Sequence, residues 1–229
     1  MHVMASCSRW GRHSPGFASP ASWDQYHGQH SVRQPMRNPA NKHPSPRDAA
    51  WPDGAIFTVG HSALPIGDFV SLLQIYGIEQ LADIRTVPRS RHNPQFNADA
   101  LTDSLAAARI DYVPMPALGG LRRARKDSVN AGWRNASFRG FADYMQSAAF
   151  DEAVEVLIRM GREKRVAIMC AEAVPWRCHR SLVADALNVR GVPTIEIMSA
   201  SDYRPHKLTP FARVDGTSIT YPPDQASLF

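Results

Sequence analysis

A short apolar run at residues 166–169 most constrains the fold, because a run of this length is typical of a fully buried strand. Cys170 and Glu172 follow it at once, and a turn containing proline leads into an amphipathic helix that begins near His179. A buried strand joined by a short turn to a helix is the building unit of a parallel α/β sheet. We therefore expect functional groups at the carboxyl end of this strand, where ligands bind in open α/β sheets.

The same alternation of apolar runs and helical patterns extends along most of the chain. Strands are predicted at residues 55–60, 80–84, 112–115, 166–169 and 194–198. Helices are predicted between and after them, at residues 65–75, 98–109, 138–147, 150–164 and 179–190. Strands that alternate with helices through mostly short connections predict a mostly parallel sheet of about five strands. Helices on both faces would make this α/β fold a three-layer sandwich.

The two ends of the chain differ in composition from the middle. Residues 1–50 are rich in Pro, Ser, His, Asn and Gln, lack apolar periodicity, and hold six Lys or Arg against two Asp. Such a segment cannot bury enough apolar surface to offset the entropy of ordering, so we predict a disordered tail. Residues 51–203 are expected to form the α/β domain, and the Pro-rich residues 204–229 an irregular extension.

The remaining composition narrows the class of protein. The formal net charge of +5 belongs mostly to the tail, so the high pI is weak support for nucleic-acid binding by the folded part. Three cysteines without regular spacing argue against a disulfide framework and suit a reducing cytoplasm. No apolar run reaches membrane-spanning length, and the N-terminus lacks the apolar core of a signal peptide. We expect a cytoplasmic protein without membrane contact, and no particular cofactor is indicated.

Polar side chains stand where three of the predicted strands end. His61 follows the first strand, Asp83 and Arg85 follow the apolar part of the second, and Cys170 and Glu172 follow the central run. The carboxyl ends of parallel strands meet at one edge of a sheet, so these side chains are expected to lie close together. Polar groups buried without partners are costly, and we therefore expect them to pair with one another or to bind a ligand.

Asp83 and Arg85 permit two interpretations. They form a buried ion pair, or the guanidinium binds an anion through bidentate contacts, and two further arginines nearby favour the anion site. The predicted helix start at His179 also offers backbone N–H groups and a positive dipole end to a phosphate. The predicted anion-binding residues are Arg85, Arg89, Arg91, His179 and Arg180, although the last of these could simply face solvent.

Glu172 is the best candidate for acid/base work, and its alternative is a salt bridge to Arg85 or Arg177. Cys170 is a nucleophile if neighbouring cations lower its pKa, but a cysteine that closes a buried strand is more often a small core residue. His61 either contacts a ligand or is a histidine hydrogen-bonded at the end of a strand. The predicted catalytic residues are Glu172, Cys170, Asp83 and His61.

A zinc site is a further alternative for the same region. Cys170, Cys178, His179 and a carboxylate are suitable zinc ligands for a catalytic site. Their spacing matches no zinc motif, and a C-x-x-C pair is missing. A thiol- or zinc-dependent enzyme is therefore retained as an alternative rather than as the leading interpretation.

These motifs together resemble the bacterial family called domain of unknown function 488. The resemblance rests on residues 58–62, residues 83–85 with Pro88, Ser90 and Arg91, residues 96–97, residues 118–120, residues 170–172 and residues 178–180. Several motifs in a fixed order make it specific, and it spans about residues 55–198. The resemblance implies a three-layer α/β fold and a single site built from the motif positions. It implies no activity.

The last five residues resemble the peptide by which DNA polymerases and repair proteins bind the bacterial sliding clamp. Gln225, Leu228 and Phe229 match that peptide, while Ala226 stands where the usual form has Leu. Two apolar anchors and an oriented glutamine suit a preformed groove. The alternative is that Leu228 and Phe229 pack back onto the domain.

We therefore expect a protein of DNA metabolism that is tethered to the sliding clamp. Its cleft would bind a nucleotide or a nucleic-acid phosphate, and it would act as a hydrolase or transferase at a nucleoside or phosphate centre. The first alternative is a non-enzymatic DNA- or protein-binding module. In that case Arg85 and Glu172 form a structural pair, and the basic loop at residues 122–126 contacts DNA.

Overall fold

The structure is a computed structural model that describes residues 44–223. Most of the predicted tail and the whole predicted clamp-binding peptide, Gln225 to Phe229, lie outside the described residues. Residues 44–50 were expected in the tail, but they pack against the domain. Pro46 is buried, and the hydroxyl of Tyr203 donates to the carbonyl oxygen of Pro44 at 3.4 Å. The folded part therefore begins earlier than predicted.

A six-stranded sheet forms the middle of the fold, in the order β3-β2-β4-β1-β5-β6. The strands are β1 (Ile56–Gly60), β2 (Gln80–Asp83), β3 (Asp111–Pro114), β4 (Val166–Cys170), β5 (Thr194–Ile197) and β6 (Tyr203–Pro205). The first five strands run parallel, and β6 pairs antiparallel with β5. The predicted mostly parallel α/β sheet is confirmed, with one strand more than the five expected.

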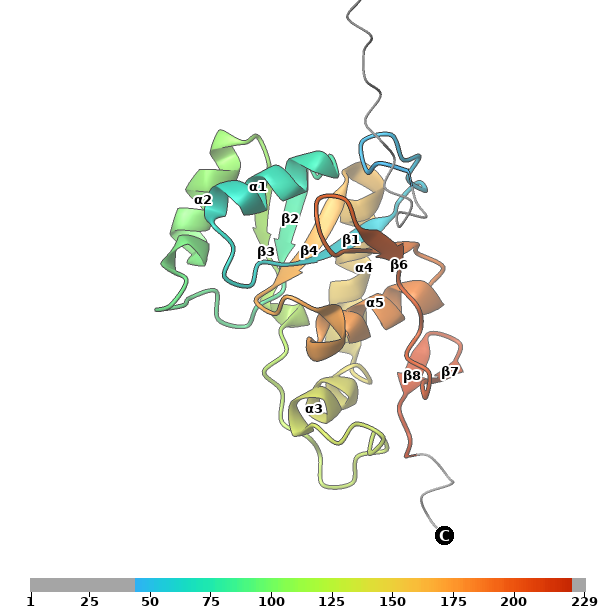
Figure 1. Cartoon of the computed structure of the whole chain (residues 1–229). Coiled ribbons are helices and arrows are strands. Elements are labelled where there is room, and N and C mark those ends of the chain that lie inside the picture. Colours follow the sequence, from blue (N-terminus) through green and yellow to red (C-terminus); the bar gives the residue numbers. More distant parts are fainter. Residues whose placement is uncertain (1–43, 224–229) are drawn as a thin grey trace, which may run out of the picture. The chain divides into compact units, whose positions relative to one another are not determined.

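Helices cover both faces of this sheet (Figure 1). One face carries α1 (Ile66–Ile75) and α2 (Ala98–Ala107), and the other carries α3 (Ala136–Tyr144), α4 (Ala148–Glu163) and α5 (Arg180–Val189). The connections from β1 to β2 and from β2 to β3 run one way along the sheet, and those from β3 to β4 and from β4 to β5 run the other way. Right-handed crossovers therefore place the two sets of helices on opposite faces.

The sheet topology opens a crevice at the carboxyl edge. The adjacent strands β4 and β1 lead into helices on opposite faces, so the loops that leave them diverge. Ligands bind at such a switch point in open α/β sheets. Alternation along each strand decides which face a residue joins: Phe57 and Val59 pack under α1 and α2, whereas Ile168 and Cys170 pack under α3, α4 and α5.

The segment after β6 is more ordered than the irregular extension that the sequence led us to expect. It contains a hairpin of β7 (Arg213–Asp215) and β8 (Ser218–Thr220), followed by the buried Tyr221. The Tyr221 hydroxyl donates to the Asp185 carboxylate of α5 at 2.8 Å. Strands of three residues are too short to show an apolar period, which is why the sequence pattern missed them.

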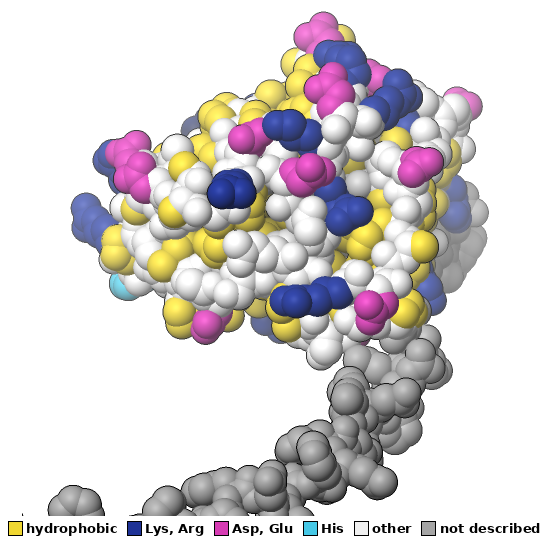
Figure 2. Space-filling view, turned by 90° about the horizontal axis from the view of Figure 1, so that it is seen from above, with side chains coloured by type: hydrophobic (Ala, Val, Ile, Leu, Met, Phe, Trp, Pro, Cys, Tyr) yellow, Lys and Arg dark blue, Asp and Glu magenta, His cyan; other side chains and the backbone are white. Residues whose placement is uncertain are grey.

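The surface of the folded part carries both signs of charge. In the face drawn in Figure 2, Lys and Arg side chains alternate with Asp and Glu side chains, and apolar atoms lie between them. Among the described residues, this face therefore offers no continuous basic surface for a nucleic acid. Within residues 44–223, no helix has the length and apolar character needed to cross a bilayer.

Candidate functional site

The three strand ends with polar residues lie side by side. Gly60 at the end of β1 is paired with Cys170 at the end of β4, and Asp83 at the end of β2 is paired with Met169. The structure thus brings the motif positions to one edge of the sheet. They stand on different faces, however, because Asp83 contacts groups on the side of α1 and α2, whereas Cys170 faces α5.

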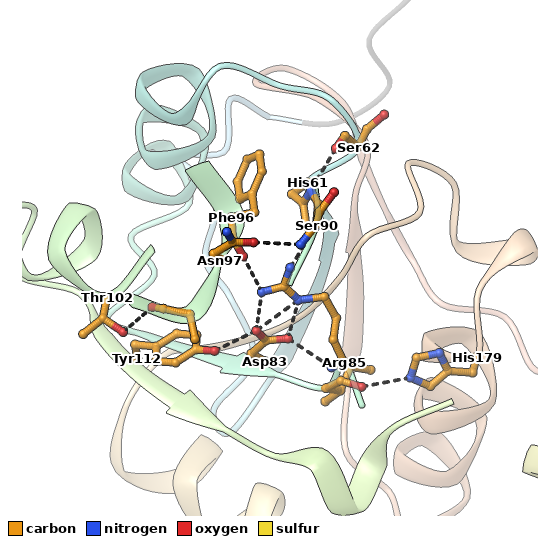
Figure 3. Close-up of polar contacts among 12 residues, drawn as sticks. His61, Ser62, Asp83, Arg85, Ser90, Phe96, Asn97, Thr102, Tyr112 and His179 are labelled. Carbon is orange, nitrogen blue, oxygen red and sulfur yellow. Dashed lines mark hydrogen bonds and ion pairs between the residues drawn. The ribbon is translucent and has the colours of Figure 1, made fainter. Parts of the chain in front are cut away.

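Asp83 and Arg85 form the buried ion pair that was the less favoured interpretation. Arg85 Nε lies 2.9 Å from Asp83 Oδ1, and Arg85 Nη2 lies 2.6 Å from Asp83 Oδ2, with 8% of the Arg85 side chain exposed. Arg85 Nη2 also donates to the carbonyl oxygen of Phe96, and the Tyr112 hydroxyl donates to Asp83 (Figure 3). The guanidinium is therefore already neutralised, which corrects the prediction that it is an open anion site.

His61 holds the other side of the same guanidinium. Its ring stacks on Phe96 with centroids 4.0 Å apart, Nδ1 lies 2.8 Å from the carbonyl oxygen of Ser62, and Nε2 lies 3.3 Å from Arg85 Nη1. Burial, with the charge of Arg85 adding to it, lowers the pKa of His61 to about 4. The neutral ring therefore donates from Nδ1 to Ser62 and accepts at Nε2 from Arg85, so it acts as an orienting group.

Arg180 is an internal brace on the opposite face of the sheet. Its side chain is fully buried, Nη1 lies 2.8 Å from Cys170 Sγ, and Nη2 lies 2.8 Å from the carbonyl oxygen of Ala173. Nη1 also donates to the carbonyl oxygen of Glu172. A Cβ on Gly60 would overlap this guanidinium and that carbonyl, so only glycine fits at the end of β1. Arg180 neither faces solvent nor reaches the cleft, which corrects its predicted role.

The amino end of α5 is capped by the chain itself. The backbone N–H of Arg180 donates to Cys178 Sγ at 3.5 Å, and that of Ser181 to the carbonyl oxygen of Cys178 at 3.1 Å. The next two N–H groups, of Leu182 and Val183, both donate to the carbonyl oxygen of His179. The first-turn donors are therefore occupied, so the predicted phosphate site at this helix start is not open.

His179 also has a structural contact in place of the predicted anion contact. Its Nε2 lies 3.2 Å from the carbonyl oxygen of Ile84, and its Nδ1 lies 3.6 Å from Cys178 Sγ. Burial lowers the pKa of His179 to about 4, so the ring is neutral and donates from Nε2. Gly120 leaves the space that the ring needs, since a Cβ there would lie 2.5 Å from Nδ1. Steric space for the His179 ring therefore explains why the motif at residues 118–120 has glycine at position 120.

Two pockets adjoin at this edge of the sheet. The apolar pocket, of about 420 Å³, is lined by residues that include Val87, Leu121, Phe138, Cys170, Arg177 and Cys178. The polar pocket, of about 410 Å³, is lined by residues that include His61, Ser62, Arg89, Ser90 and Asn93. Both are lined by Arg85, Val87, Ala171 and Glu172. The shared residues form the boundary between one cavity and the other.

Glu172 and Arg89 are the predicted residues that remain open to a ligand. Both are exposed, and within residues 44–223 the Glu172 carboxylate has no ion-pair or hydrogen-bond partner. The salt bridge from Glu172 to Arg85 or Arg177, which was the alternative interpretation, is therefore not formed. Arg91 is also exposed but lines neither of the two pockets.

The basic loop of the binding-module alternative is partly engaged within the domain. The guanidinium of Arg122 lies 3.7 Å from the centre of the Tyr144 ring and donates to the carbonyl oxygen of Gly119. Arg125 pairs with Asp127 at 3.0 Å on the surface. The structural pairing of Arg85 that this alternative requires is present, but its partner is Asp83 rather than Glu172.

The described residues also bear on the zinc alternative. Cys170 and Cys178 are both free and buried. No cluster of three or more His, Cys, Asp or Glu side chains within residues 44–223 has an arrangement that could hold a metal ion.

The groups that support the site had no predicted role. Phe96 belongs to one of the family motifs and Tyr112 to a predicted strand, but neither carries a charge that would mark it as a partner of the Asp83–Arg85 pair. Gly60 and Gly120 are needed for the close approach of Arg180 and His179, and the glycines within the motifs were the available signal.

Comparisons with known proteins give one finding. A family model described as "Domain of unknown function DUF488" matches residues 65–187, which is more than half of the 229-residue chain. A search of curated proteins and a search of solved structures each gave no significant match. The matched region contains the buried Asp83–Arg85 pair, Glu172 and the Arg180 brace. The chain therefore belongs to the family of domain of unknown function DUF488.

Proposed function

We propose that the two adjoining pockets bind a phosphate-bearing nucleotide and that Glu172 acts on it at a nucleoside or phosphate centre. One observation carries the proposal: Glu172 is the acidic side chain that the two pockets share, and no other acidic side chain among the described residues lines either of them. A carboxylate at the junction of two cavities can reach a bond between the two parts of a ligand that fills both.

The charge around Glu172 supports an anionic ligand. Arg89 in the polar pocket and Arg177 in the apolar pocket are exposed, and neither forms an ion pair within residues 44–223. Arg85 is already paired with Asp83 and adds little net charge. The open side chains therefore present two guanidinium groups and one carboxylate, and Arg is the side chain best suited to bidentate contacts with phosphate.

The contrast between the two pockets supports a nucleotide in particular. Phe138, Val87 and Leu121 give the apolar pocket surfaces against which a flat ring can pack. Arg89, Ser90 and Ser62 give the polar pocket a cation and two hydroxyl groups for a phosphate. Ser62 also has a positive φ of 47°, a strained backbone geometry of the kind found at binding sites.

The chemistry asked of Glu172 is that of a general acid/base or of a nucleophile. As a base the carboxylate takes a proton from water that attacks the nucleotide, and as a nucleophile it attacks the same centre directly. His61 and Asp83 have a different part, because both hold Arg85 in place behind the polar pocket. They are positioning residues in this proposal, and Cys170 lies beneath the apolar pocket.

The test is the Glu172→Gln variant, assayed on a panel of nucleotides and short DNAs with the products identified by mass spectrometry. We expect turnover to fall by at least about 100-fold while the thermal unfolding midpoint stays unchanged, because Gln keeps the shape but cannot accept a proton. Glu152→Gln, an exposed carboxylate of α4, is the matched control. Turnover by Glu172→Gln at the wild-type rate would refute the assignment.

We also propose that the protein works in the cytoplasm in DNA metabolism, with the sliding clamp as its partner. This rests on the sequence of the last five residues, Gln225 to Phe229, which lie outside the described residues. Deleting Leu228 and Phe229 should abolish clamp binding measured by calorimetry. Ala226→Leu should tighten binding, since it restores the usual second apolar residue. Equal affinities for all three chains would end this proposal.

A further inference from the structure

Arg180 is a buried cation without a carboxylate. Its side chain is fully buried, and within residues 44–223 no carboxylate oxygen of Asp or Glu lies within ion-pair distance of its guanidinium. Asp185, on the same helix, is bound instead to His206 and Tyr221. Burying a charge without an opposite charge is costly, so the guanidinium needs an anion among its neighbours.

Cys170 is the neighbour of Arg180 that can supply that charge. The other acceptors of the guanidinium are the backbone carbonyl oxygens of Glu172 and Ala173, which carry no net charge. Cys170 Sγ lies 2.8 Å from Arg180 Nη1. A sulfur held by a fixed cation in this way is stabilised as a thiolate, and the thiolate is the reactive form of cysteine.

Cys178 is placed to assist the same sulfur. Both sulfurs line the apolar pocket, and both contact Arg180. The Arg180 guanidinium lies 2.8 Å from Cys170 Sγ, and the backbone N–H of Arg180 donates to Cys178 Sγ at 3.5 Å. Burial alone would raise the pKa of Cys170, but the hydrogen bond from Cys178 and the charge of Arg180 outweigh it and lower the pKa to about 7. The pKa of Cys178 is raised, because its proton is held in the hydrogen bond to Cys170 and because the thiol is buried. Cys170 is therefore the thiol that ionises first, near neutral pH, while Cys178 keeps its proton.

We propose that Cys170 and Cys178 form a redox-active dithiol that reduces a small hydroperoxide. The Cys170 thiolate attacks the peroxide, so that an S–O bond forms, the O–O bond breaks, and the alkoxide or hydroxide leaves and takes up a proton from water. The Cys178 thiol then attacks the resulting sulfenic acid, so that an S–S bond forms and water leaves. Two electrons pass from the thiols to the peroxide, and a dithiol reductant resets the pair.

The burial of the pair limits which oxidants it accepts. Cys170 is 2% exposed and Cys178 is 4% exposed, and both are reached through the apolar pocket. Hydrogen peroxide and short alkyl hydroperoxides are small enough to enter this pocket and reach the buried sulfurs.

The experiment uses the full-length chain with Cys7→Ser, which removes the remaining thiol. The reduced protein is treated with hydrogen peroxide or a short alkyl hydroperoxide, and intact mass is recorded with time. We expect the loss of two hydrogen atoms and its reversal by a small dithiol. With a Cys170 pKa of about 7, the reaction at neutral pH should be roughly tenfold faster than that of a cysteine with an ordinary pKa.

Two single variants in this background separate the steps. Cys178→Ser should gain oxygen on Cys170 without forming the disulfide. Cys170→Ser should do neither, because burial raises the pKa of Cys178 and the Arg180 guanidinium is directed at position 170 rather than at Cys178. Alkylation in denaturant confirms that each thiol is chemically intact. A wild-type pair that resists peroxide while a free cysteine reacts would overturn the proposal, and so would equal oxidation of the two variants. Both readouts are masses and do not depend on nucleotide turnover.

Discussion

Two buried guanidinium groups organise the carboxyl edge of the sheet, and each has a different kind of partner. Arg85 is paired with the carboxylate of Asp83, and Arg180 lies against the sulfur of Cys170. Both also donate to backbone carbonyl oxygens, which ties the loops after the strands to the sheet. At the scale of single residues, these contacts fix the carboxyl edge of the sheet, which positions the exposed side chains of the cleft, Glu172 and Arg89.

Gly60→Ala tests the brace made by Arg180. The new Cβ would overlap the Arg180 guanidinium and the carbonyl of Glu172, so this change should lower the free energy of unfolding by about 1–3 kcal/mol. Gly67→Ala is the matched control, because nothing lies within 4 Å of a Cβ at that helical position. The control should be neutral or stabilising by up to about 1 kcal/mol. Equal effects in urea unfolding would contradict the account of the brace.

The sequence predicted the residue types at this edge better than their partners. The pairing of Asp83 with Arg85 was foreseen as an alternative, since two residues separated by one position on a strand share a face. The contact of Arg180 with Cys170 was not foreseen, because a helix start and a strand end ten positions apart meet only when the turn between them is folded. Periodicity gives the face of a residue and not the direction of a long side chain.

At the scale of elements, a buried network joins the last part of the chain to α5 and β5. His206 lies between Asp185 of α5 at 2.8 Å and Glu196 of β5 at 2.7 Å. Tyr221 donates to the other oxygen of Asp185. The four residues of the network come from four separate segments of the chain, so no local sequence pattern predicts that they interact. This is why the sequence suggested an irregular extension where the structure has an integral part of the fold.

The network predicts how stability depends on pH. Burial acts to lower the pKa of His206, but the hydrogen bonds from its ring to Asp185 and Glu196 outweigh burial and raise the pKa to about 9. Protonated His206 therefore adds to the free energy of unfolding. This stabilisation is fully present below pH 6.5, the pKa of histidine in the unfolded chain, and is lost as the pH rises through about 9. The rise in the pKa of His206 corresponds to a stabilisation of roughly 3 kcal/mol at low pH.

The measurement is the difference in unfolding free energy between the wild type and His206→Gln, taken from pH 6 to pH 9.5. The difference should shrink as the pH rises through this window. Taking the difference cancels the opposing contribution of Cys170, whose lowered pKa adds stability as the pH rises above about 7. A difference that stays constant with pH would show that His206 is not held protonated.

At the scale of the whole molecule, the open cations of the cleft matter more than the net charge. Acidic and basic residues are interspersed over the face drawn in Figure 2, whereas the two adjoining pockets carry one open arginine each, Arg89 and Arg177, on either side of Glu172, which lines both. The order of the strands produces this arrangement, because it sends the loops after β1 and β4 to opposite faces. The alternation of strands and helices in the sequence predicted that the site lies at the carboxyl edge of the sheet. It did not predict that the cleft is divided into two pockets.

The proposed function requires the cleft to recognise the phosphate of a nucleotide. The most direct measurement is calorimetric titration of nucleoside monophosphates and the matching nucleosides into wild type, Arg89→Ala and Arg213→Ala, the last being an exposed arginine of β7 outside both pockets. We predict that wild type and Arg213→Ala prefer the monophosphate by about tenfold or more, and that Arg89→Ala loses this preference. Equal binding of nucleoside and nucleotide by the wild type, or an unchanged preference in Arg89→Ala, would contradict it.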